Sequence, residues 1–283
     1  MELLVGECDV IFLTVPDSRI RSVWMQIREY EIEGKTICHC SGALSSADAF
    51  PGIEAAGAFG YSVHPLFAVS DKYNVYRELA DVFFTLEGGG LQSQAPERST
   101  AALQREVPDD SSIAWPSQDP ETESAAAEGG AKMDPAGLAL KSMLEQLGNP
   151  VETIRAEDKI LYHCAATMAS NLMCGLVHQS IELMGRCGFT QQDAVKALTP
   201  ILTGNMEHIV QEGPVRSLTG PVERNDTATV EKHLACLQDT QEKELYRLLS
   251  LRLMRMAQDR HPQRDYTGLR KLLEKENSKG GFI

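Results

Sequence analysis

Short apolar runs and helical patterns alternate through the first 155 residues of the chain. Apolar runs typical of buried strands occur at 8–15, 35–40, 57–63, 81–88 and 150–154, with helical patterns at 18–27 and 137–148. Strands separated by helices in this order predict right-handed crossovers and a parallel sheet. We therefore expect an α/β domain over residues 1–155.

The pattern after these runs is entirely helical. Residues 157–188 form a single pattern about eight turns long, which Gly188 ends as a C′ glycine. Thr190 and Asp193 have the spacing of a capping box and begin a second helix. Further helices are predicted from about Thr227, over 241–259 and at 269–275. The prediction is an all-helical second domain over 156–283.

Residues 88–135 interrupt the first domain. They hold five prolines, nine acidic residues against three basic ones, and a single aromatic residue, Trp115. A segment of this composition buries too little apolar area to offset the entropy cost of ordering it. The sequence therefore predicts a disordered acidic insertion.

Composition excludes several classes of partner. With 283 residues, a net charge of -13 and a pI near 5.0, the chain lacks the clustered basic residues that a phosphate backbone attracts, so no nucleic acid is expected. No apolar run approaches about 18 residues, the length that spans a membrane, so no membrane partner is expected. The seven cysteines are scattered along the chain, and their odd number predicts free thiols and a cytoplasmic protein. Cys38 and Cys40 flank His39, but no further residues follow at ligand spacing, so no metal site is predicted.

One helical stripe within 157–188 carries most of the candidate chemistry. At about 100° per residue, a set of polar or small side chains falls within one arc of about 120°. They are Lys159, His163, Thr167, Ser170, Asn171, Cys174 and His178. A stripe in contact with water is normally rich in Glu, Lys and Arg, whereas this one is mostly neutral, which favours the wall of a cavity. A hydrogen-bonded face that packs against another helix is the alternative.

Several motifs in fixed order resemble a family of bacterial Rossmann-like proteins whose C-terminal half is catalogued as a domain of unknown function. The motifs are TVPD at 14–17, HCSGALS at 39–45, SVHPLF at 62–67, DKILYHCAATMASN at 158–171 and LTGPVERNDTATVEKHL at 218–234. This family is related to the 6-phosphogluconate dehydrogenase, hydroxyisobutyrate dehydrogenase and pyrroline-carboxylate reductase superfamily. The resemblance implies an N-terminal domain that binds NAD(P), and a helical domain that closes over a small-molecule substrate and forms a homodimer.

The same resemblance implies that the chain is truncated and lacks the first part of its nucleotide-binding domain. Family members begin with a strand, a Gly-rich turn and a helix, whereas here CDVIFLTVPD already stands at 8–17. The chain has no G-x-G-x-x-G, whose glycines let backbone amides approach a pyrophosphate. We therefore expect a partial Rossmann-like parallel sheet without its first mononucleotide-binding half, and weak or absent binding of NADP or NAD.

Two strand ends supply the candidate cofactor contacts. Val15, Pro16 and Asp17 end the first strand and begin a helix, so their backbone would lie beside a nicotinamide. A helix-start signal without a ligand is the alternative. Ser41 and Gly42 end the second strand at the edge where α/β sheets bind ligands, and the resemblance implies a cofactor contact there. A tight turn without a ligand is the alternative.

Three side chains are candidates for catalysis. His64 follows the third strand at the same edge, where it could polarise a carbonyl or carry a proton. A buried histidine bonded to backbone is the alternative. By the resemblance, Lys159 aligns with the lysine that related hydroxyacid dehydrogenases use as general acid/base, in a Lys-x-x-x-Asn pattern. His163 stands where that pattern has Asn, and this departure leaves the substrate class and the reaction open.

Three further residues are candidates for substrate binding. Ser170 and Asn171 would orient the substrate, or else satisfy a neighbouring helix. Arg224 would hold a carboxylate or phosphate with its planar fork of donors. The alternative for its motif is a turn followed by a helix cap at Asp226.

Two functions of different classes follow. One is an NAD(P)-dependent oxidoreductase in which Lys159 and His163 handle the proton that accompanies hydride transfer. The other is a non-catalytic ligand-binding or dimerisation module derived from such an enzyme. A cofactor titration separates them, because saturable binding favours the enzyme.

Overall fold

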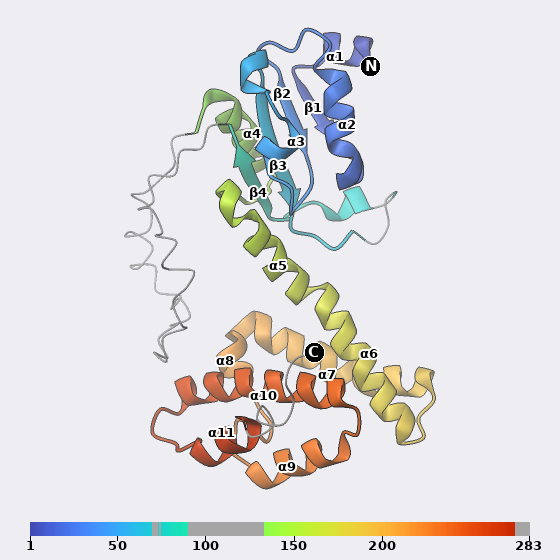
Figure 1. Cartoon of the computed structure of the whole chain (residues 1–283), viewed down its shortest axis with the longest axis vertical. Coiled ribbons are helices and arrows are strands. Elements are labelled where there is room, and N and C mark those ends of the chain that lie inside the picture. The colour runs from blue at the N-terminus through green and yellow to red at the C-terminus, as the bar shows by residue number, and fades with distance from the viewer. Residues whose placement is uncertain (70–72, 74, 90–132, 275–283) are drawn as a thin grey trace. The chain divides into compact units, whose positions relative to one another are not determined.

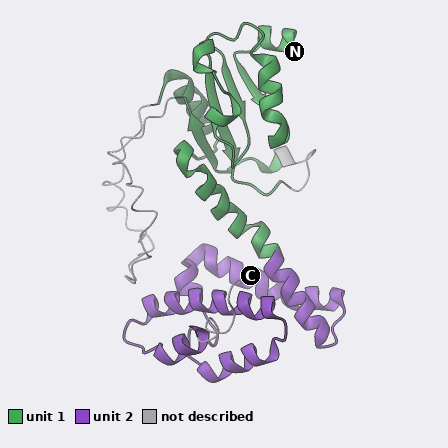
Figure 2. Ribbon diagram, viewed as in Figure 1, with its two compact units in different colours: residues 1–99, 118–174 green, residues 100–117, 175–283 purple. Residues whose placement is uncertain are grey.

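A computed structural model describes residues 1–69, 73, 75–89 and 133–274. The insertion predicted at 88–135 lies almost entirely outside these residues. The described residues divide into two compact units, with the division between Cys174 and Gly175 (Figure 2). The first unit thus continues past residue 155, and each unit is described by itself.

The first unit contains a five-stranded sheet in the order β1-β2-β3-β4-β5 (Figure 1). Its strands are β1 (Val10–Leu13), β2 (Thr36–His39), β3 (Phe59–Pro65), β4 (Phe84–Gly88) and β5 (Val151–Thr153). Its helices are α1 (Glu2–Glu7), α2 (Asp17–Ile27), α3 (Ser46–Ala49), α4 (Pro135–Gln146) and α5 (Lys159–Ala169), with 3-10 turns at Glu54–Ala56, Val75–Glu78 and Ala156–Asp158. Each predicted strand is therefore present, and the Rossmann-like α/β class is confirmed.

One strand pair departs from the predicted parallel sheet. Three pairs are parallel, but β4 runs antiparallel to β3, with His64 opposite Thr85. A parallel return needs a long crossover, usually a helix, and the regular element described between these strands is the short 3-10 turn Val75–Glu78. The chain therefore runs back directly beside β3, and the sheet is mixed.

Helices cover both faces of the sheet. Neighbouring residues of a strand point to opposite faces, and in β2 Ile37 packs with α2 whereas Cys38 packs with α4. The first core includes Ile11, Leu13, Ile20, Trp24, Ile27 and Ile37, and the second contains Cys38, Tyr61, Val63, Leu86, Leu140, Leu144 and Val151. Buried apolar side chains thus hold the strand ends in place from both sides.

The pattern at 157–188 forms two helices where one is predicted. Helix α5 ends at Ala169 and α6 (Asn171–Arg186) begins after Ser170, whose φ of -118° and ψ of -82° are not helical. The Ser170 hydroxyl donates to the carbonyl oxygen of Ala166 at 2.7 Å. A serine that bonds back to the preceding turn competes with the helical hydrogen bonds, but Ser180 makes the same bond inside α6 without a break, so this bond alone does not explain the interruption.

The described part of the second unit is helical. After the end of α6 it contains α7 (Gln191–Glu212), α8 (Pro214–Ser217), α9 (Thr227–Cys236), α10 (Thr240–Arg260) and α11 (Thr267–Glu274). Thr190 caps α7 by accepting a hydrogen bond from the backbone N–H of Asp193 at 3.1 Å, as its spacing predicts. The core of this unit includes Val222, Val230, Leu234, Met254, Ala257, Tyr266, Leu269 and Leu273.

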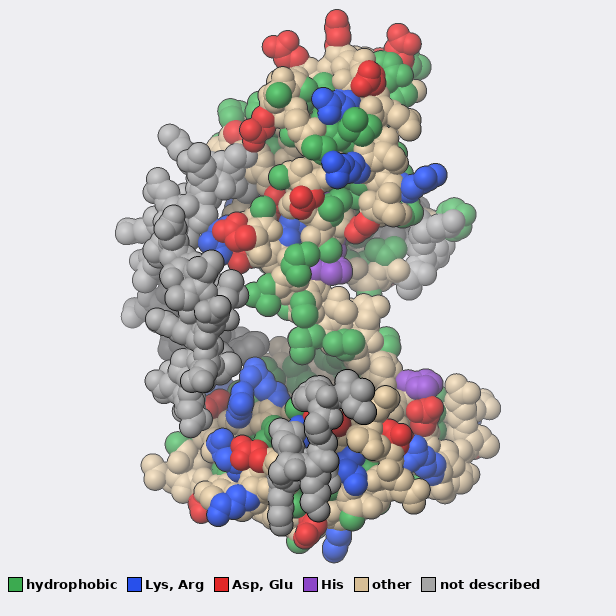
Figure 3. Space-filling model, viewed as in Figure 1, with side chains coloured by type: hydrophobic (Ala, Val, Ile, Leu, Met, Phe, Trp, Pro, Cys, Tyr) green, Lys and Arg blue, Asp and Glu red, His purple; other side chains and the backbone are tan. Residues whose placement is uncertain are grey.

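Large apolar side chains remain exposed on α5, α6 and α7. They include Ile160, Leu161, Met168, Leu172, Leu176, Val195, Ile201, Leu202, Met206, Ile209 and Val210. Figure 3 shows hydrophobic surface along α5. By length and composition alone, residues 156–186 would suffice to cross a membrane, and none of the 18-residue window that meets this test is buried. The prediction that no segment spans a membrane is based on the length of uninterrupted apolar runs. This window has a mean hydropathy of 1.4 although polar residues interrupt its apolar ones.

Leu86 in β4 is 0% exposed and Leu147, after α4, is 69% exposed. We predict that Leu86→Ala lowers the free energy of unfolding by about 2–5 kcal/mol, because it removes buried methyl groups and leaves a cavity. Leu147→Ala is the matched control, with an expected change within about 0.5 kcal/mol. Urea unfolding followed by tryptophan fluorescence measures both, and equal losses would contradict the burial of β4.

Candidate active site

The carboxyl ends of β1, β2 and β3 lie at one edge of the sheet, the kind of edge where α/β proteins bind ligands. Ser41, just after β2, donates its hydroxyl to Oδ2 of Asp17, at the start of α2, at 2.6 Å. The same hydroxyl oxygen accepts the backbone N–H groups of residues 43 and 44 at 3.3 and 3.0 Å. These bonds fix the turn at Ser41 and Gly42 against the start of α2.

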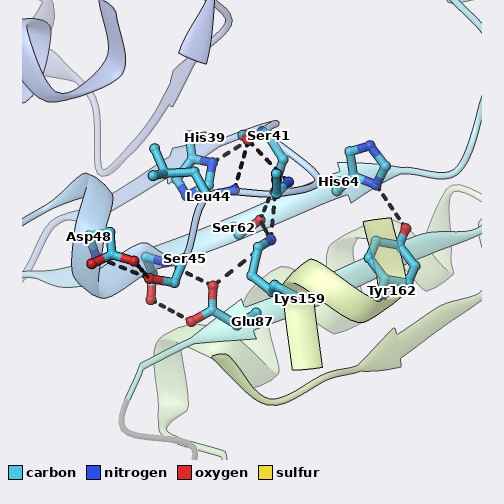
Figure 4. A network of polar contacts seen from close by, with 12 residues as sticks. His39, Ser41, Leu44, Ser45, Asp48, Ser62, His64, Glu87, Lys159 and Tyr162 are labelled. Carbon is cyan, nitrogen blue, oxygen red and sulfur yellow. Dashed lines mark hydrogen bonds and ion pairs between the residues drawn. The ribbon is translucent and has the colours of Figure 1, made fainter. Parts of the chain in front are cut away.

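Lys159, the first residue of α5, extends toward these strand ends and is 1% exposed (Figure 4). Its Nζ donates to the carbonyl oxygen of Ser41 at 3.2 Å and to the hydroxyl of Ser62. Oε2 of Glu87 lies 4.0 Å from the same nitrogen. The amine thus connects three strands, since Ser41 follows β2, Ser62 lies in β3 and Glu87 lies in β4.

Burial and charge set the protonation of this amine. Burial lowers the pKa of Lys159 to about 8, and the carboxylates of Glu87 and Asp17 oppose that shift. Burial raises the pKa of Glu87, while the backbone N–H and hydroxyl of Ser46, at 2.8 and 2.9 Å, favour its ionised form. A lysine that titrates near 8 can both donate and accept a proton close to neutral pH.

His64 and His163 both pack against Gly42. A Cβ atom at Gly42 would lie 2.7 Å from Nδ1 of His163 and 2.8 Å from Nε2 of His64, so only glycine allows both rings to approach the backbone here. The hydroxyl of Tyr162 is 2.8 Å from Nδ1 of His64. Burial, followed by the charges of Lys159 and His163, lowers the pKa of His64 to about 4. This imidazole is therefore neutral at pH 7.

The structure brings some predicted residues together and leaves others apart. Those at the strand-end edge are Val15, Pro16, Asp17, Ser41, Gly42, His64, Lys159 and His163. Of the stripe that is predicted to line a cavity, only Lys159 is buried, and Thr167 is half-buried. The other five members are exposed, so the prediction of an enclosed stripe is wrong within one chain: His163, Ser170, Asn171, Cys174 and His178. Arg224 is an exposed residue of the second unit.

Three residues of the site escape the sequence prediction. Ser62 and Glu87 lie opposite each other in the β3/β4 register, and both are buried. Tyr162 follows Lys159 by three residues, so it lies on the same side of α5. The sequence does contain a signal for Ser62 and Glu87, because each is a polar residue inside an apolar strand and such a residue needs a buried partner.

The residues at this edge fit one end of a dinucleotide. Val15 is 36% exposed and offers an apolar contact for a flat ring, with the backbone of Ser41 and Gly42 at the neighbouring strand end. Helix α2, however, begins with the acidic residue Asp17, and a negative charge at that position opposes a diphosphate. The nicotinamide end therefore fits, and the diphosphate end does not.

A twisted α/β sheet with polar side chains at the carboxyl ends of its strands, followed by helices, defines a Rossmann-like protein with a C-terminal helical domain. Residues 128–253 match the sequence family described as a domain of unknown function, DUF2520. This match includes Lys159, His163 and Arg224. No curated protein matches the chain in sequence.

Solved structures share the fold. Protein TM1727 from Thermotoga maritima is 23% identical and gives a TM-score of 0.62, over 89% of this chain and 80% of that one. A Bacteroides fragilis protein assigned as an NADP oxidoreductase is 14% identical, with a TM-score of 0.56 over 87% and 75% of the two chains. An NADH-preferring ketol-acid reductoisomerase from an uncultured archean is 12% identical, with a TM-score of 0.52 over 98% and 73%. Likeness at these identities shows that the chain shares their fold.

Lys159→Met tests the buried amine through the pH dependence of stability. The pKa of Lys159 is about 8 in the folded protein against an ordinary value of 10.5, so between these values the unfolded chain binds more protons. We therefore predict that the stability of the wild type, relative to Lys159→Met, rises as the pH rises through this window and is level below it. Urea unfolding at about pH 7.5, 9 and 10.5 measures this difference, and parallel profiles of the two proteins would rule out a lowered pKa.

Proposed function

We propose that this protein is an NAD(P)-dependent oxidoreductase of a small-molecule substrate, in which Lys159 gives or takes the proton that accompanies hydride transfer. The observation that supports this most is the buried amine at the ends of β2 and β3, with its pKa lowered to about 8. General acid-base catalysis requires a group whose pKa lies near the working pH, and such shifted groups concentrate at functional sites.

The remaining residues of the edge divide between cofactor and substrate. The nicotinamide, when bound, supplies or accepts the hydride. Val15, Pro16, Ser41 and Gly42 contact its ring, and Asp17 holds the Ser41 hydroxyl in place. Among the substrate-facing groups of the first unit, His64 donates to a carbonyl oxygen, His163 assists Lys159 with the proton, and Ser170 and Asn171 orient the substrate.

Dinucleotide binding by this chain is weak in our proposal. The 283 residues contain no G-x-G-x-x-G, whose glycines let backbone amides approach a pyrophosphate. A second candidate function is supported by the missing Gly-rich motif and by the exposed apolar side chains of α5, α6 and α7. It is a non-catalytic ligand-binding or dimerisation module that retains the residues at the strand-end edge without using a cofactor.

Reduced nicotinamide mononucleotide and NADPH separate these proposals, because the mononucleotide contains only the part of the cofactor that the site fits. We predict that both bind weakly but saturably, with dissociation constants within about threefold of each other, that is within about 0.7 kcal/mol. Gly42→Ala should weaken both by about tenfold or more, since its methyl group displaces both imidazoles. Nicotinamide fluorescence measures binding.

Gly185→Ala is the matched control, because a Cβ at Gly185 meets no atom within 4 Å. Absence of saturable binding by either compound would contradict the oxidoreductase and favour the module. If NADPH bound more than about tenfold tighter than the mononucleotide, the proposed impairment would be wrong while the oxidoreductase would stand.

We also propose that the chain forms a homodimer through its helical region. Leu172 and Leu176 on α6 are 58% and 43% exposed, and Ile160 and Leu161 on α5 are 67% and 68% exposed. A second copy of the chain would bury these side chains and gain about 25 cal/mol per Å² of apolar area removed from water. The neutral polar side chains on the same helices favour a protein partner, since they can hydrogen-bond across an interface.

Leu172→Glu is predicted to convert a dimer into a monomer, because it places a charge among the apolar side chains that the second copy covers. Leu138→Glu on α4, where the leucine is 56% exposed, is the control and should leave the dimer intact. Sedimentation velocity at micromolar concentration reads out both. A monomeric wild type, or one that partitions into phospholipid vesicles, would contradict the homodimer.

The cysteines support a cytoplasmic protein in this proposal. All seven are free, and Cys164, Cys174, Cys187 and Cys236 are exposed. Exposed thiols persist in a reducing compartment.

A further inference from the structure

Tyr162 and His64 form an ordered pair at the strand-end edge. The hydroxyl oxygen of Tyr162 lies 2.8 Å from Nδ1 of His64. Their rings meet edge to face, with centroids 5.6 Å apart and an interplanar angle of 87°. Since α5 carries both Tyr162 and the buried Lys159, the position of the hydroxyl is set by the helix that the amine anchors (Figure 4).

The chemistry of the pair decides the direction of this hydrogen bond. A phenol is a stronger hydrogen-bond donor than a neutral imidazole, and an imidazole nitrogen is a stronger acceptor than a phenol oxygen. Burial raises the pKa of Tyr162 and lowers that of His64, so the phenol keeps its proton and the imidazole carries only one. When the hydroxyl donates to Nδ1, the single imidazole proton must be on Nε2.

Nε2 of His64 remains available to a ligand. Among the described residues, the hydrogen bond of this imidazole is the one that Nδ1 makes with Tyr162. Nε2 lies 2.8 Å from the position that a Cβ atom would occupy at Gly42, and Nδ1 of His163 lies 2.7 Å from that same position. A donor group without a protein partner, next to a second imidazole and a glycine, is suited to bind a substrate oxygen.

We infer that Tyr162 is a positioning residue whose hydroxyl fixes His64 in the Nε2–H tautomer and leaves that N–H as a free donor beside Gly42. The identity of the acceptor rests on the proposed function: it is the carbonyl oxygen of the substrate. A neutral imidazole donor polarises a carbonyl without transferring its proton. The tautomer itself requires neither cofactor nor substrate.

The second unit contains a matched control pair. Nδ1 of His233 lies 2.7 Å from the hydroxyl of Tyr246, and their rings also meet edge to face, with centroids 5.6 Å apart at 85°. Tyr162→Phe and Tyr246→Phe therefore each remove one hydroxyl from the same kind of contact. Only the first is expected to change His64.

The test is a long-range proton–nitrogen NMR spectrum of the full chain, labelled with nitrogen-15, at about pH 7. His64→Gln assigns the His64 signals. In the wild type, Nδ1 of His64 should give the signal of an unprotonated nitrogen that accepts a hydrogen bond, and Nε2 that of a protonated one. Tyr162→Phe should shift both toward the averaged values of an imidazole that exchanges tautomers, whereas Tyr246→Phe should shift His233 alone.

A wild-type His64 with its proton on Nδ1, or one whose signals are unchanged in Tyr162→Phe, would overturn the inference. Circular dichroism of Tyr162→Phe shows that the variant is folded, and if it is not, the wild-type tautomer alone decides. The outcome is separable from the proposed function. Failure of both nicotinamide compounds to bind would remove the oxidoreductase and leave the tautomer, and a wrong tautomer would remove the role of Tyr162 and leave cofactor binding.

Discussion

The burial of the Lys159 amine is the interaction on which the candidate site depends. An ammonium group can be removed from water only where polar groups surround it, and the antiparallel register supplies them by placing Ser62 opposite Glu87. Because Lys159 is the first residue of α5, satisfying its nitrogen also fixes the start of that helix against the strand ends. The next turn of the helix then carries Tyr162 to His64. One buried amine thus determines where the catalytic candidates lie.

Sequence patterns identify the elements of this fold better than their pairing. Apolar runs are typical of buried strands, and the runs at 8–15, 35–40, 57–63, 81–88 and 150–154 all contain strands. The first of these strands, β1, is nevertheless an edge strand that is buried on one face only, since Val10 and Phe12 are exposed. The direction of a strand leaves no such mark, because the connection to the preceding strand decides it. The strand β4 is therefore predicted, but its antiparallel direction is not. The break at Ser170 leaves no mark in the sequence either, since a serine is tolerated in a helix, as Ser180 in α6 shows.

The site shows the same limit. Lys159 and His64 can be found from their residue types and their positions at a helix start and a strand end. Glu87 cannot, because its role arises from the register that places it opposite Ser62. Helical periodicity gives the direction of a side chain around the axis, but it does not show what covers that side. Ser170 shares a stripe with Lys159 and is nevertheless exposed.

Burial acts on two bases at this edge and gives them different tasks. It lowers the pKa of Lys159 to about 8 and that of His64 to about 4. The ordinary pKa of a lysine is 10.5 and that of a histidine is 6.5, so similar downward shifts bring the pKa of Lys159 close to neutral pH and that of His64 far below it. The charge of Lys159 further disfavours a proton on His64, so a protonated amine and a neutral imidazole support each other. Two groups whose pKa values are held apart in this way do not compete for one proton, and this separation is how a single site obtains both a proton donor and a neutral hydrogen-bond donor.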